Sequence, residues 1–252
     1  MLPDFVCIGA MKAGTTSLYG YLNEHPQIEM PPIKELDYFV EELNWPCGQG
    51  WYEEHFAHVP EGSLTGDISP NYSKHPHFGG VPERMARVVP EAKLIYVMRD
   101  PIARMRSHWV HAVDAGNVRE PLGKELLGNQ YYRECSSYGM QLERYLEHFP
   151  RERVLLLTAE ELRAERHRTL ERVFEFLGVA GDLPVAAADR AQHSSDDKRV
   201  PRRGPLPARK LRPGETNLSE AEERKLRELM RPDMERLARY MPTPFDAWGI
   251  LR

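Results

Sequence analysis

Small residues and one lysine follow a short apolar run near the start of the chain. Phe5 to Ile8 is apolar and rich in strand formers, and Gly9 to Gly14 interrupts it with mostly small side chains. From Thr15 apolar residues recur at helical spacing until Pro26, before which a helix must end. A strand, a glycine loop and a helix in this order point several backbone N–H groups at one anion. The stretch therefore predicts a phosphate-binding loop with Lys12 inside it.

The position of this lysine separates the loop from that of nucleotide triphosphatases. Their pattern, Gly-x-x-x-x-Gly-Lys-Ser/Thr, places a lysine after the second glycine, where it reaches the β- and γ-phosphates. Gly9, Gly14 and Thr16 match this pattern. Thr15 takes the lysine position, however, and Lys12 lies earlier, nearer to the first phosphate and its leaving bond. We expect a short phosphate-bearing ligand; a strand-to-helix turn without a ligand is the alternative.

An arginine follows a second apolar run. Leu94 to Met98 is continuously apolar, and Arg99 comes directly after it, at the end of a strand where open α/β sheets bind ligands. Asp100 and Pro101 are a favourable N-cap and first residue for a helix, which carries Ser107 about two turns further on. An arginine fork suits a dianion better than a lysine does. The alternative is a surface ion pair between the neighbouring Arg and Asp.

Together the two motifs resemble those of the sulfotransferases that use 3'-phosphoadenosine 5'-phosphosulfate (PAPS). The run KAGTTSL resembles their 5'-phosphosulfate loop, and Arg99 with Ser107 resembles their 3'-phosphate site. The resemblance implies transfer of a sulfuryl group to an acceptor hydroxyl on a sugar, lipid or secondary metabolite, leaving 3',5'-phosphoadenosine (PAP). An amine is an alternative acceptor. The loop residues implied in donor binding are Lys12, Ala13, Gly14, Thr15, Thr16 and Ser17.

The resemblance also proposes a general base. Heparan sulfate sulfotransferases carry a catalytic Glu in a Glu-Lys-Ser/Thr-Pro-x-Tyr segment, and here Asp67 takes that place before Ser69-Pro70. The alternative is that Asp67 only caps the turn. His75 and His77 are rivals for the base, because cytosolic sulfotransferases use a histidine.

Lys34 and Glu35 match a Lys-Glu-x-x-Phe-Phe segment that lines the active-site floor in this family. Lys34, Asp67 and His75 are therefore predicted to contact the acceptor. Asp37 stands where heparan sulfate enzymes often carry a histidine. An exposed charge pair beside packed aromatic residues is an equal alternative.

No metal is expected. His75 with His77, or His108 with His111 on a helix, lacks a third ligand at suitable spacing.

Two further nucleotide contacts are predicted from the family. Tyr138 lies at a junction that the family places near the adenine. Residues 198–212 carry seven basic and no acidic side chains among prolines, and the family has a basic loop here that closes over the nucleotide. A solvated loop is the alternative. The predicted contacts of this loop are Lys198, Arg199, Arg202 and Arg203.

These elements predict a single α/β domain over residues 1–252, with a central parallel sheet flanked by helices and a P-loop-like sulfotransferase fold. Arg153 to Thr158 is another buried strand, and a helical stripe ends at Gly178. Residues 217–252 form a helical C-terminal segment, in which Ser219 and Glu222 make a capping box and Pro232 kinks or splits the helix.

Composition limits the remaining choices. The net charge of −4 gives no general reason to bind nucleic acid. Three widely spaced cysteines favour a reducing compartment, and no apolar run approaches 18 residues, so we expect a cytoplasmic protein without a membrane anchor. The partners are thus the nucleotide donor and a small-molecule or carbohydrate acceptor; the oligomeric state is open. A small-molecule kinase and a non-catalytic nucleotide-binding protein are the alternative functions.

Overall fold

The computed structural model describes residues 1–181, 204–206 and 209–252. The chain divides into two compact units, one of Met1–Met98 with Glu143–Lys198 and one of Arg99–Leu142 with Arg199–Arg252. The expectation of one domain over the whole chain stays a prediction.

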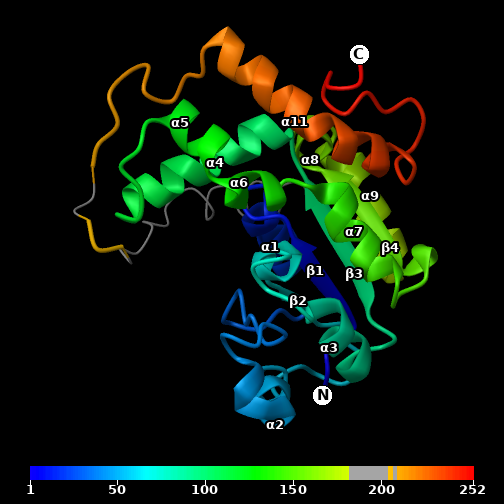
Figure 1. Cartoon of the computed structure of the whole chain (residues 1–252). Coiled ribbons are helices and arrows are strands. Elements are labelled where there is room, and N and C mark those ends of the chain that lie inside the picture. The colour runs from blue at the N-terminus through cyan, green and yellow to red at the C-terminus, as the bar shows by residue number, and fades with distance from the viewer. Residues whose placement is uncertain (182–203, 207–208) are drawn as a thin grey trace. The chain divides into compact units, whose positions relative to one another are not determined.

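The first unit is built on a parallel sheet of four strands in the order β2-β1-β3-β4 (Figure 1). The strands are β1 (Phe5–Gly9), β2 (Gly66–Ile68), β3 (Lys93–Met98) and β4 (Val154–Thr158). Almost every strand residue is buried, which explains why the sequence shows continuous apolar runs instead of alternation. Because the strands are parallel, their carboxyl ends meet at one edge of the sheet. The predicted fold class, a central parallel sheet flanked by helices, is confirmed.

The register of the sheet puts the predicted base on the strand next to the one that leads into the phosphate loop. Val6 of β1 pairs with Asp67 of β2, and Cys7 pairs with Ile68. After β2 ends, the N–H of Ser69 still donates to the carbonyl oxygen of Cys7 at 3.1 Å. The turn that follows Asp67 is therefore fixed to the strand that leads into the loop.

Helices and short 3-10 turns complete this unit. They are α1 (Thr15–Asn23), α2 (Gly48–Glu54), α3 (Val81–Val88), α8 (Ala159–Ala164), α9 (Arg166–Leu177), η1 (Trp45–Cys47), η2 (Pro70–Ser73) and η3 (Arg151–Arg153). Helix α9 buries its predicted apolar stripe and ends at Gly178, whose φ of 85° confirms the expected C-cap. Helix α7 (Tyr138–Leu146) begins in the second unit and ends in the first.

The second unit is helical. It contains α4 (Pro101–Asp114), α5 (Leu122–Gly128), α6 (Gln130–Glu134) and α11 (Glu220–Ala238), and α4, α5 and α11 pack against one another (Figure 1). Asp100 caps α4 by accepting from the N–H of Ala103 at 2.8 Å, with Pro101 in the first turn, as predicted.

Helix α11 starts at the predicted capping box of Ser219 and Glu222. It then continues through Pro232, so a division of the helix at this residue is wrong. Packing explains the continuity, because Met230 and Met234 on either side of the proline are buried. Asp233 follows the proline, and its carboxylate accepts from the N–H groups of Gly139 and Met140 at the start of α7.

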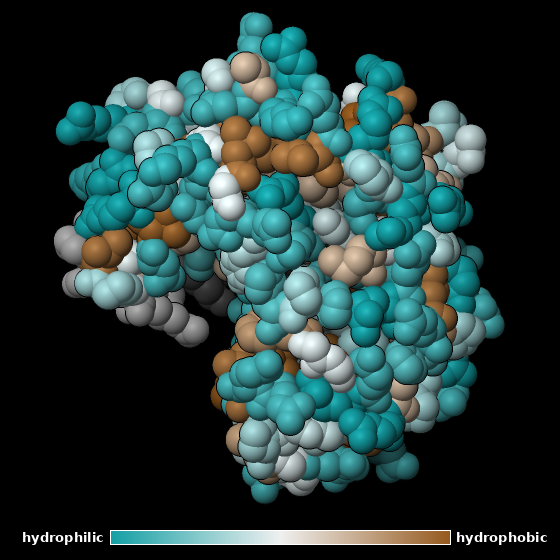
Figure 2. Space-filling view, in the orientation of Figure 1, coloured by the Kyte–Doolittle hydropathy of each residue, from teal (hydrophilic) through white to brown (hydrophobic). Residues whose placement is uncertain are grey.

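The surface in Figure 2 is mostly hydrophilic, with apolar side chains in small patches. Among the described residues the exposed large apolar side chains are Met1, Ile33, Leu43 and Leu229. Within the same part of the chain, no helix combines the length and apolar character needed to span a bilayer.

Candidate active site

The phosphate loop joins β1 to α1 as predicted. Gly14 is the N-cap of α1 and has a φ of 99°, a left-handed conformation that favours glycine. Among the described residues no side chain caps this helix, and its first backbone hydrogen bond runs from Leu18 N–H to the Gly14 carbonyl at 3.1 Å. The N–H groups of Thr15, Thr16 and Ser17 precede that bond, so they are positioned to bind an anion together with the positive end of the helix dipole.

Lys12 lies within this loop and is half-buried. Its φ of 68° places a non-glycine residue in the left-handed region, which holds the backbone of the loop in a turn. The structure thus brings the predicted residues from Lys12 to Ser17 together on a single strand-to-helix connection.

The start of the loop packs closely on η2. A Cβ at Gly9 would lie 2.1 Å from the Oγ of Ser73, so only glycine fits here. That hydroxyl is buried and has no hydrogen-bond partner among the described residues. Ser73 could not be identified from the sequence beyond its place after the Ser-Pro turn. Its Oγ is an additional donor beside the phosphate loop.

Asp67 is buried completely at the end of β2. Its Oδ1 accepts from the Ser69 hydroxyl at 2.6 Å, and its Oδ2 accepts from the phenols of Tyr52 and Tyr72 at 3.0 and 2.6 Å. Burial raises the pKa of Asp67, although these three donors and the charge of Lys34 act in the opposite direction. The assignment of Asp67 as the base stays a prediction. Its surroundings are those of a carboxylate that holds other groups in place.

Asp37 is joined to this cluster through a serine. The N–H of Asp37 donates to the Ser69 hydroxyl at 3.0 Å, which in turn donates to Asp67. The Oδ2 of Asp37 accepts from the Asn71 side chain at 2.8 Å. Its Oδ1 is buried, and no group in the described part of the chain donates to it.

The environment of Asp37 disfavours its charged form. Burial is the largest effect and raises the pKa of Asp37 to about 7. The hydrogen bond from Asn71, the next largest effect, lowers it, the charges of Asp67 and Glu35 raise it further, and that of Lys74 lowers it. A carboxylate with a pKa near 7 is partly ionised at neutral pH and is a stronger base than an ordinary Asp.

The predicted floor segment is attached to the same strand. The N–H of Glu35 donates to the carbonyl of Ile68 at 3.2 Å, and the Lys34 ammonium pairs with the Glu35 carboxylate. Lys34 also lowers the pKa of Asp67 by its charge, which places it near the carboxylates. Of the predicted histidines, His75 is half-buried and His77 is exposed, both just after η2.

Two tyrosines of the cluster were not identified as site residues from the sequence. Tyr52 lies on α2 and stacks on Tyr38 with ring centroids 4.3 Å apart. Burial and Asp67 raise the pKa of both Tyr52 and Tyr72 well above the usual value, so these phenols stay protonated donors. Tyr72 occupies the tyrosine position of the Ser-Pro-x-Tyr segment, so the sequence motif could have identified it. Residues 40–62 are rich in aromatic residues without a clear period, so Tyr52 was one of several rings that could line a cleft or pack in the core.

In the second unit, Arg99 follows β3 and Ser107 lies on α4; both are half-buried. Tyr138 is fully buried, and its hydroxyl donates to the carbonyl oxygen of Arg99 at 2.8 Å. Its ring also contacts Trp248. These contacts support the backbone of Arg99, while direct contact of Tyr138 with a nucleotide stays a prediction.

The predicted basic contacts Lys198, Arg199, Arg202 and Arg203 lie outside the described residues. Two described residues of the same segment are attached after α4: the N–H of Gly204 donates to Ala115 and the N–H of Leu206 to Gly116, at 2.7 and 3.0 Å.

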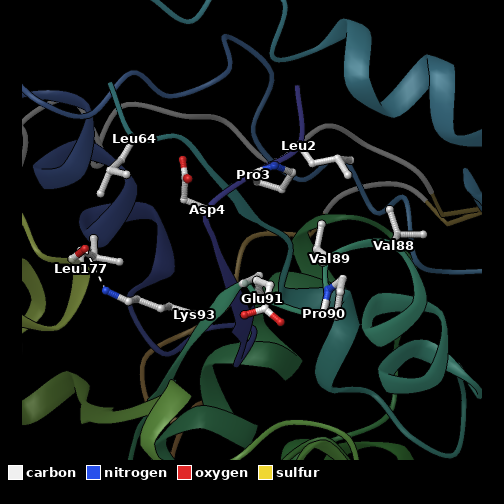
Figure 3. A pocket seen from close by; sticks show the side chains of 11 residues that line it. Leu2, Pro3, Asp4, Leu64, Val88, Val89, Pro90, Glu91, Lys93 and Leu177 are labelled. Atoms are coloured by element: carbon white, nitrogen blue, oxygen red, sulfur yellow. Dashed lines mark hydrogen bonds between the residues drawn. The ribbon is translucent and has the colours of Figure 1, made fainter. Parts of the chain in front are cut away.

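A metal cluster and a separate cavity are the other possible kinds of site. Among residues 1–181, 204–206 and 209–252, no three His, Cys, Asp or Glu side chains are grouped as metal ligands. A cavity of about 400 Å³ lies at the amino ends of β1 and β3, lined by Pro3, Val89 and Leu177 (Figure 3). Parallel α/β sheets bind ligands at the carboxyl ends of their strands, so this cavity is at the wrong end for the reaction.

A buried parallel sheet, a glycine loop leading to an uncapped helix and a group of carboxylates on the neighbouring strand are the features of an α/β protein with a phosphate-binding loop. The chain belongs to the sulfotransferase domain family, whose model matches residues 2–197. The resemblance expected from the two motifs is confirmed.

Relatives and solved structures agree with this family. A human bifunctional heparan sulfate N-deacetylase/N-sulfotransferase 3 is 30% identical over 200 residues, which cover 71% of this chain and 22% of that protein. The membrane-associated sulfotransferase kil1 of Dictyostelium discoideum is 37% identical over 111 residues, 43% of this chain and 22% of that protein. The chain thus spans about a fifth of the length of these relatives.

The fold is similar to that of two sulfotransferase crystal structures. One, from Alicyclobacillus acidocaldarius, has a TM-score of 0.78 and 24% identity and covers 99% of both chains. The other, the mouse sulfotransferase SULT7A1 complexed with PAP, has a TM-score of 0.57 and 15% identity and covers 98% of this chain and 88% of that one.

Proposed function

We propose that this chain transfers the sulfuryl group of PAPS to an acceptor hydroxyl and releases PAP. The observation that supports the proposal is the uncapped, glycine-started helix α1, which follows β1, together with the carboxylates of Asp67 and Asp37 on and next to the neighbouring strand β2. An anion held at the loop and a base beside it are the two requirements of in-line transfer.

The loop supplies the electrostatic part of catalysis. In this proposal the N–H groups from Gly14 to Ser17 bind the 5'-phosphosulfate, and Lys12 neutralises the bridging oxygen as its bond to sulfur breaks. Sulfuryl transfer resembles phosphoryl transfer in this respect, because positioning and charge stabilisation supply most of the rate. A lysine that acts on the leaving oxygen needs no magnesium ion beside it.

Arg99 and Ser107 are proposed to bind the 3'-phosphate, which distinguishes PAPS from ordinary adenosine nucleotides. The side chains of Lys198, Arg199, Arg202 and Arg203 are proposed to add positive charge over the bound donor. The hydrogen bonds of Gly204 and Leu206 at the end of α4 support this role, since they fix part of the basic segment in the unit that contains Arg99.

The segment that encloses Asp67 indicates the kind of acceptor. Residues 35–62 carry seven acidic side chains and no Lys or Arg. Leu43 of this segment and Ile33, two residues before it, are exposed, and the rings of Trp45 and Trp51 are half-buried. Apolar and aromatic surface with negative charge favours an uncharged acceptor with an apolar part, and it opposes a polyanion such as the heparan sulfate in the names of the relatives. Lys34 and His75 are proposed to contact this acceptor.

Donor use is tested by the melting temperature in the presence of PAP, adenosine 5'-phosphate or ATP. Binding to the native state raises this temperature, and PAP should raise it most. Acceptors are then tested by mass spectrometry for an added sulfate, with phenols, lipid alcohols, neutral sugars and amines. Stabilisation by ATP but not by PAP would reject the proposal, and sulfation of amines alone would change the acceptor from hydroxyl to nitrogen.

A further inference from the structure

We propose that Asp37, and not Asp67, is the general base that takes the proton of the acceptor, and that Asp67 positions the segment carrying it. The inference rests on the proposed function, because it names the base of sulfuryl transfer.

Asp67 is badly placed to take a proton from a substrate. Its side chain has no exposed surface, and both oxygens already accept hydrogen bonds, from Ser69 on one side and from Tyr52 and Tyr72 on the other. An acceptor hydroxyl would have to displace one of these buried donors. The three donors also stabilise the ionised form, which weakens Asp67 as a base relative to a carboxylate with fewer donors.

Asp37 has the opposite environment in the same cluster. One of its oxygens accepts a single hydrogen bond from Asn71, and the other, Oδ1, is buried with no donor from the described residues. A buried acceptor without a donor is unfavourable, and such a group in a folded protein calls for an explanation. The O–H of an acceptor substrate is a donor that would satisfy it. The residue as a whole is half-buried, whereas Asp67 is buried completely, although Oδ1 of Asp37 is itself covered in this structure. In this proposal the acceptor reaches the carboxylate of Asp37 from the exposed side of the residue.

The backbone holds this side chain in position. Asp37 has a φ of 50°, and its N–H is bound to Ser69, whose hydroxyl is bound to Asp67. Asp67 is thus linked to Asp37 through one serine and acts on the base without meeting the substrate. The phenols of Tyr52 and Tyr72 fix Asp67 from its other side.

Several charged groups set the protonation of Asp37. Burial is the largest effect, and Asp67 on β2 and Glu35 in the same segment also raise its pKa, to about 7, while Asn71 and Lys74 lower it. Tyr72 is a neutral neighbour, because its own pKa is raised by burial, by Asp67 and by Asp37. A base with a pKa near the working pH combines a useful ionised fraction with a strong affinity for the proton.

The step balances as follows. The acceptor oxygen forms a bond to the sulfur of PAPS while its proton passes to Oδ1 of Asp37. The bond between sulfur and the bridging oxygen breaks, and its electron pair stays on that oxygen as the 5'-phosphate of PAP. Asp37, now a carboxylic acid, returns its proton to water after the sulfated product leaves.

The test compares Asp37→Asn, Asp67→Asn and His75→Ala with the exposed control Asp114→Asn. Each variant is assayed by release of PAP from PAPS with ring-substituted phenols of graded acidity and with an aliphatic alcohol. Hydrolysis of PAPS, in which water is the acceptor, is measured in parallel, so the result does not depend on a preferred acceptor. The melting temperature with and without PAP reports folding and donor binding.

We expect Asp37→Asn to lower kcat for the alcohol by about 100-fold or more, the usual contribution of a general base. The loss should shrink as the phenol becomes more acidic, and the rise of kcat through pH 7 should disappear. Asp67→Asn should lower the melting temperature and raise KM but keep that rise. A purely structural role of Asp37 would reduce all acceptors equally and leave the pH profile unchanged.

The proposal is overturned if the rise of kcat near pH 7 survives in Asp37→Asn, or if it is lost in Asp67→Asn or His75→Ala instead. These results leave sulfuryl transfer intact. If the wild-type protein neither binds PAP nor releases it from PAPS, the proposed function itself is wrong. The measurements on the wild type alone show this.

Discussion

Lys12 carries the positive charge of the phosphate loop, and its place decides what it stabilises. It precedes Gly14 by two residues and is half-buried in the turn before α1. Charge on the bridging oxygen appears only as the bond to sulfur breaks, so a lysine beside that oxygen acts mainly in the transition state.

Lys12→Ala should therefore lower kcat by about 100-fold or more while the affinity for PAP changes by only a few-fold. Steady-state kinetics with PAPS and calorimetric titration with PAP measure the two effects separately. Lys124→Ala, which removes an exposed lysine on α5, is the matched control. Activity within a few-fold of wild type in Lys12→Ala would contradict the role assigned to the loop.

Arg99 and Ser107 should determine the preference for a 3'-phosphate. PAP should bind much more tightly than adenosine 5'-phosphate, and Arg99→Ala should remove most of the difference. Arg99→Lys should restore only part of it, because a lysine keeps the charge but loses the two-pronged hydrogen bonding. Titration of both nucleotides into each variant measures this, with the exposed Arg119 replaced by Ala as control. Equal affinities in the wild type would reject the 3'-phosphate assignment.

Asp37 should also make the stability of the protein depend on pH. Its pKa is about 7 in the folded protein and near 4 in the unfolded chain, so between these values the folded state holds a proton that the unfolded state lacks. Stability contributed by protonated Asp37 is thus lost as pH rises from about 4 to 7. The free energy of unfolding of the wild type should fall relative to Asp37→Asn over this range, by an amount on the order of 1 kcal/mol or more.

Urea unfolding at a series of pH values checks this. Asp114→Asn, an exposed carboxylate change on α4, should run parallel to the wild type. If the curves of wild type and Asp37→Asn are parallel from pH 4 to 7, the folded environment does not raise the pKa of Asp37.

The residues of the loop and of the Arg99 motif could be identified from the sequence because their spacing is local. The different environments of the Asp67 and Asp37 carboxylates could not be predicted in this way. It arises from Tyr52, Ser69 and Asn71, which come from separate segments and meet only in the folded protein.

At the level of elements, the connection from β1 to α1 depends on close packing at Gly9. Its φ of 140° is strained for other residues, and an added Cβ would overlap Ser73. Gly14 has a φ of 99° but open space around it, so an added Cβ would cause backbone strain without steric overlap.

Gly9→Ala should therefore destabilise the protein more than Gly14→Ala, for which we expect a loss of about 1–2 kcal/mol. Replacing Ser73 by Gly in the Gly9→Ala background should recover the part caused by overlap. Gly128→Ala, at the end of α5 with open space around it, should have little effect. Chemical denaturation measures all four. If Gly9→Ala loses no more stability than Gly14→Ala, η2 moves away from the added methyl group without a cost in free energy.

The strands and the capped helices could be predicted because apolar runs and caps are properties of consecutive residues. Pro232 shows the limit of that approach: a local rule ends the helix, but burial of Met230 and Met234 keeps it intact. The stretch from residue 40 to 62 has no hydrophobic period. Its helix α2 packs through contacts of Tyr52 with Tyr38 and Phe56.

For the molecule as a whole, the distribution of charge says more than its sum. The net charge is only −4, whereas residues 35–62 alone contain seven acidic residues and no Lys or Arg. In the described part of the chain, two of these carboxylates form ion pairs: Glu41 with the buried Arg84 at 2.9 Å, and Glu35 with Lys34. The segment itself therefore keeps an excess of negative charge, while the basic run of 198–212 lies elsewhere in the sequence.

This charge should select against anionic acceptors. An uncharged phenol or lipid alcohol should be sulfated with a KM that changes little between low and moderate salt, whereas a polyanionic polysaccharide should react poorly at low salt and better as salt screens the repulsion. Glu42→Lys with Glu54→Lys removes two exposed negative charges and adds two positive ones, so it should lower KM for the polyanion and leave that for the neutral acceptor nearly unchanged. Glu147→Lys with Glu152→Lys, outside the segment, is the control for total charge. A wild-type protein that prefers the polyanion at low salt would show that the acidic segment does not face the acceptor.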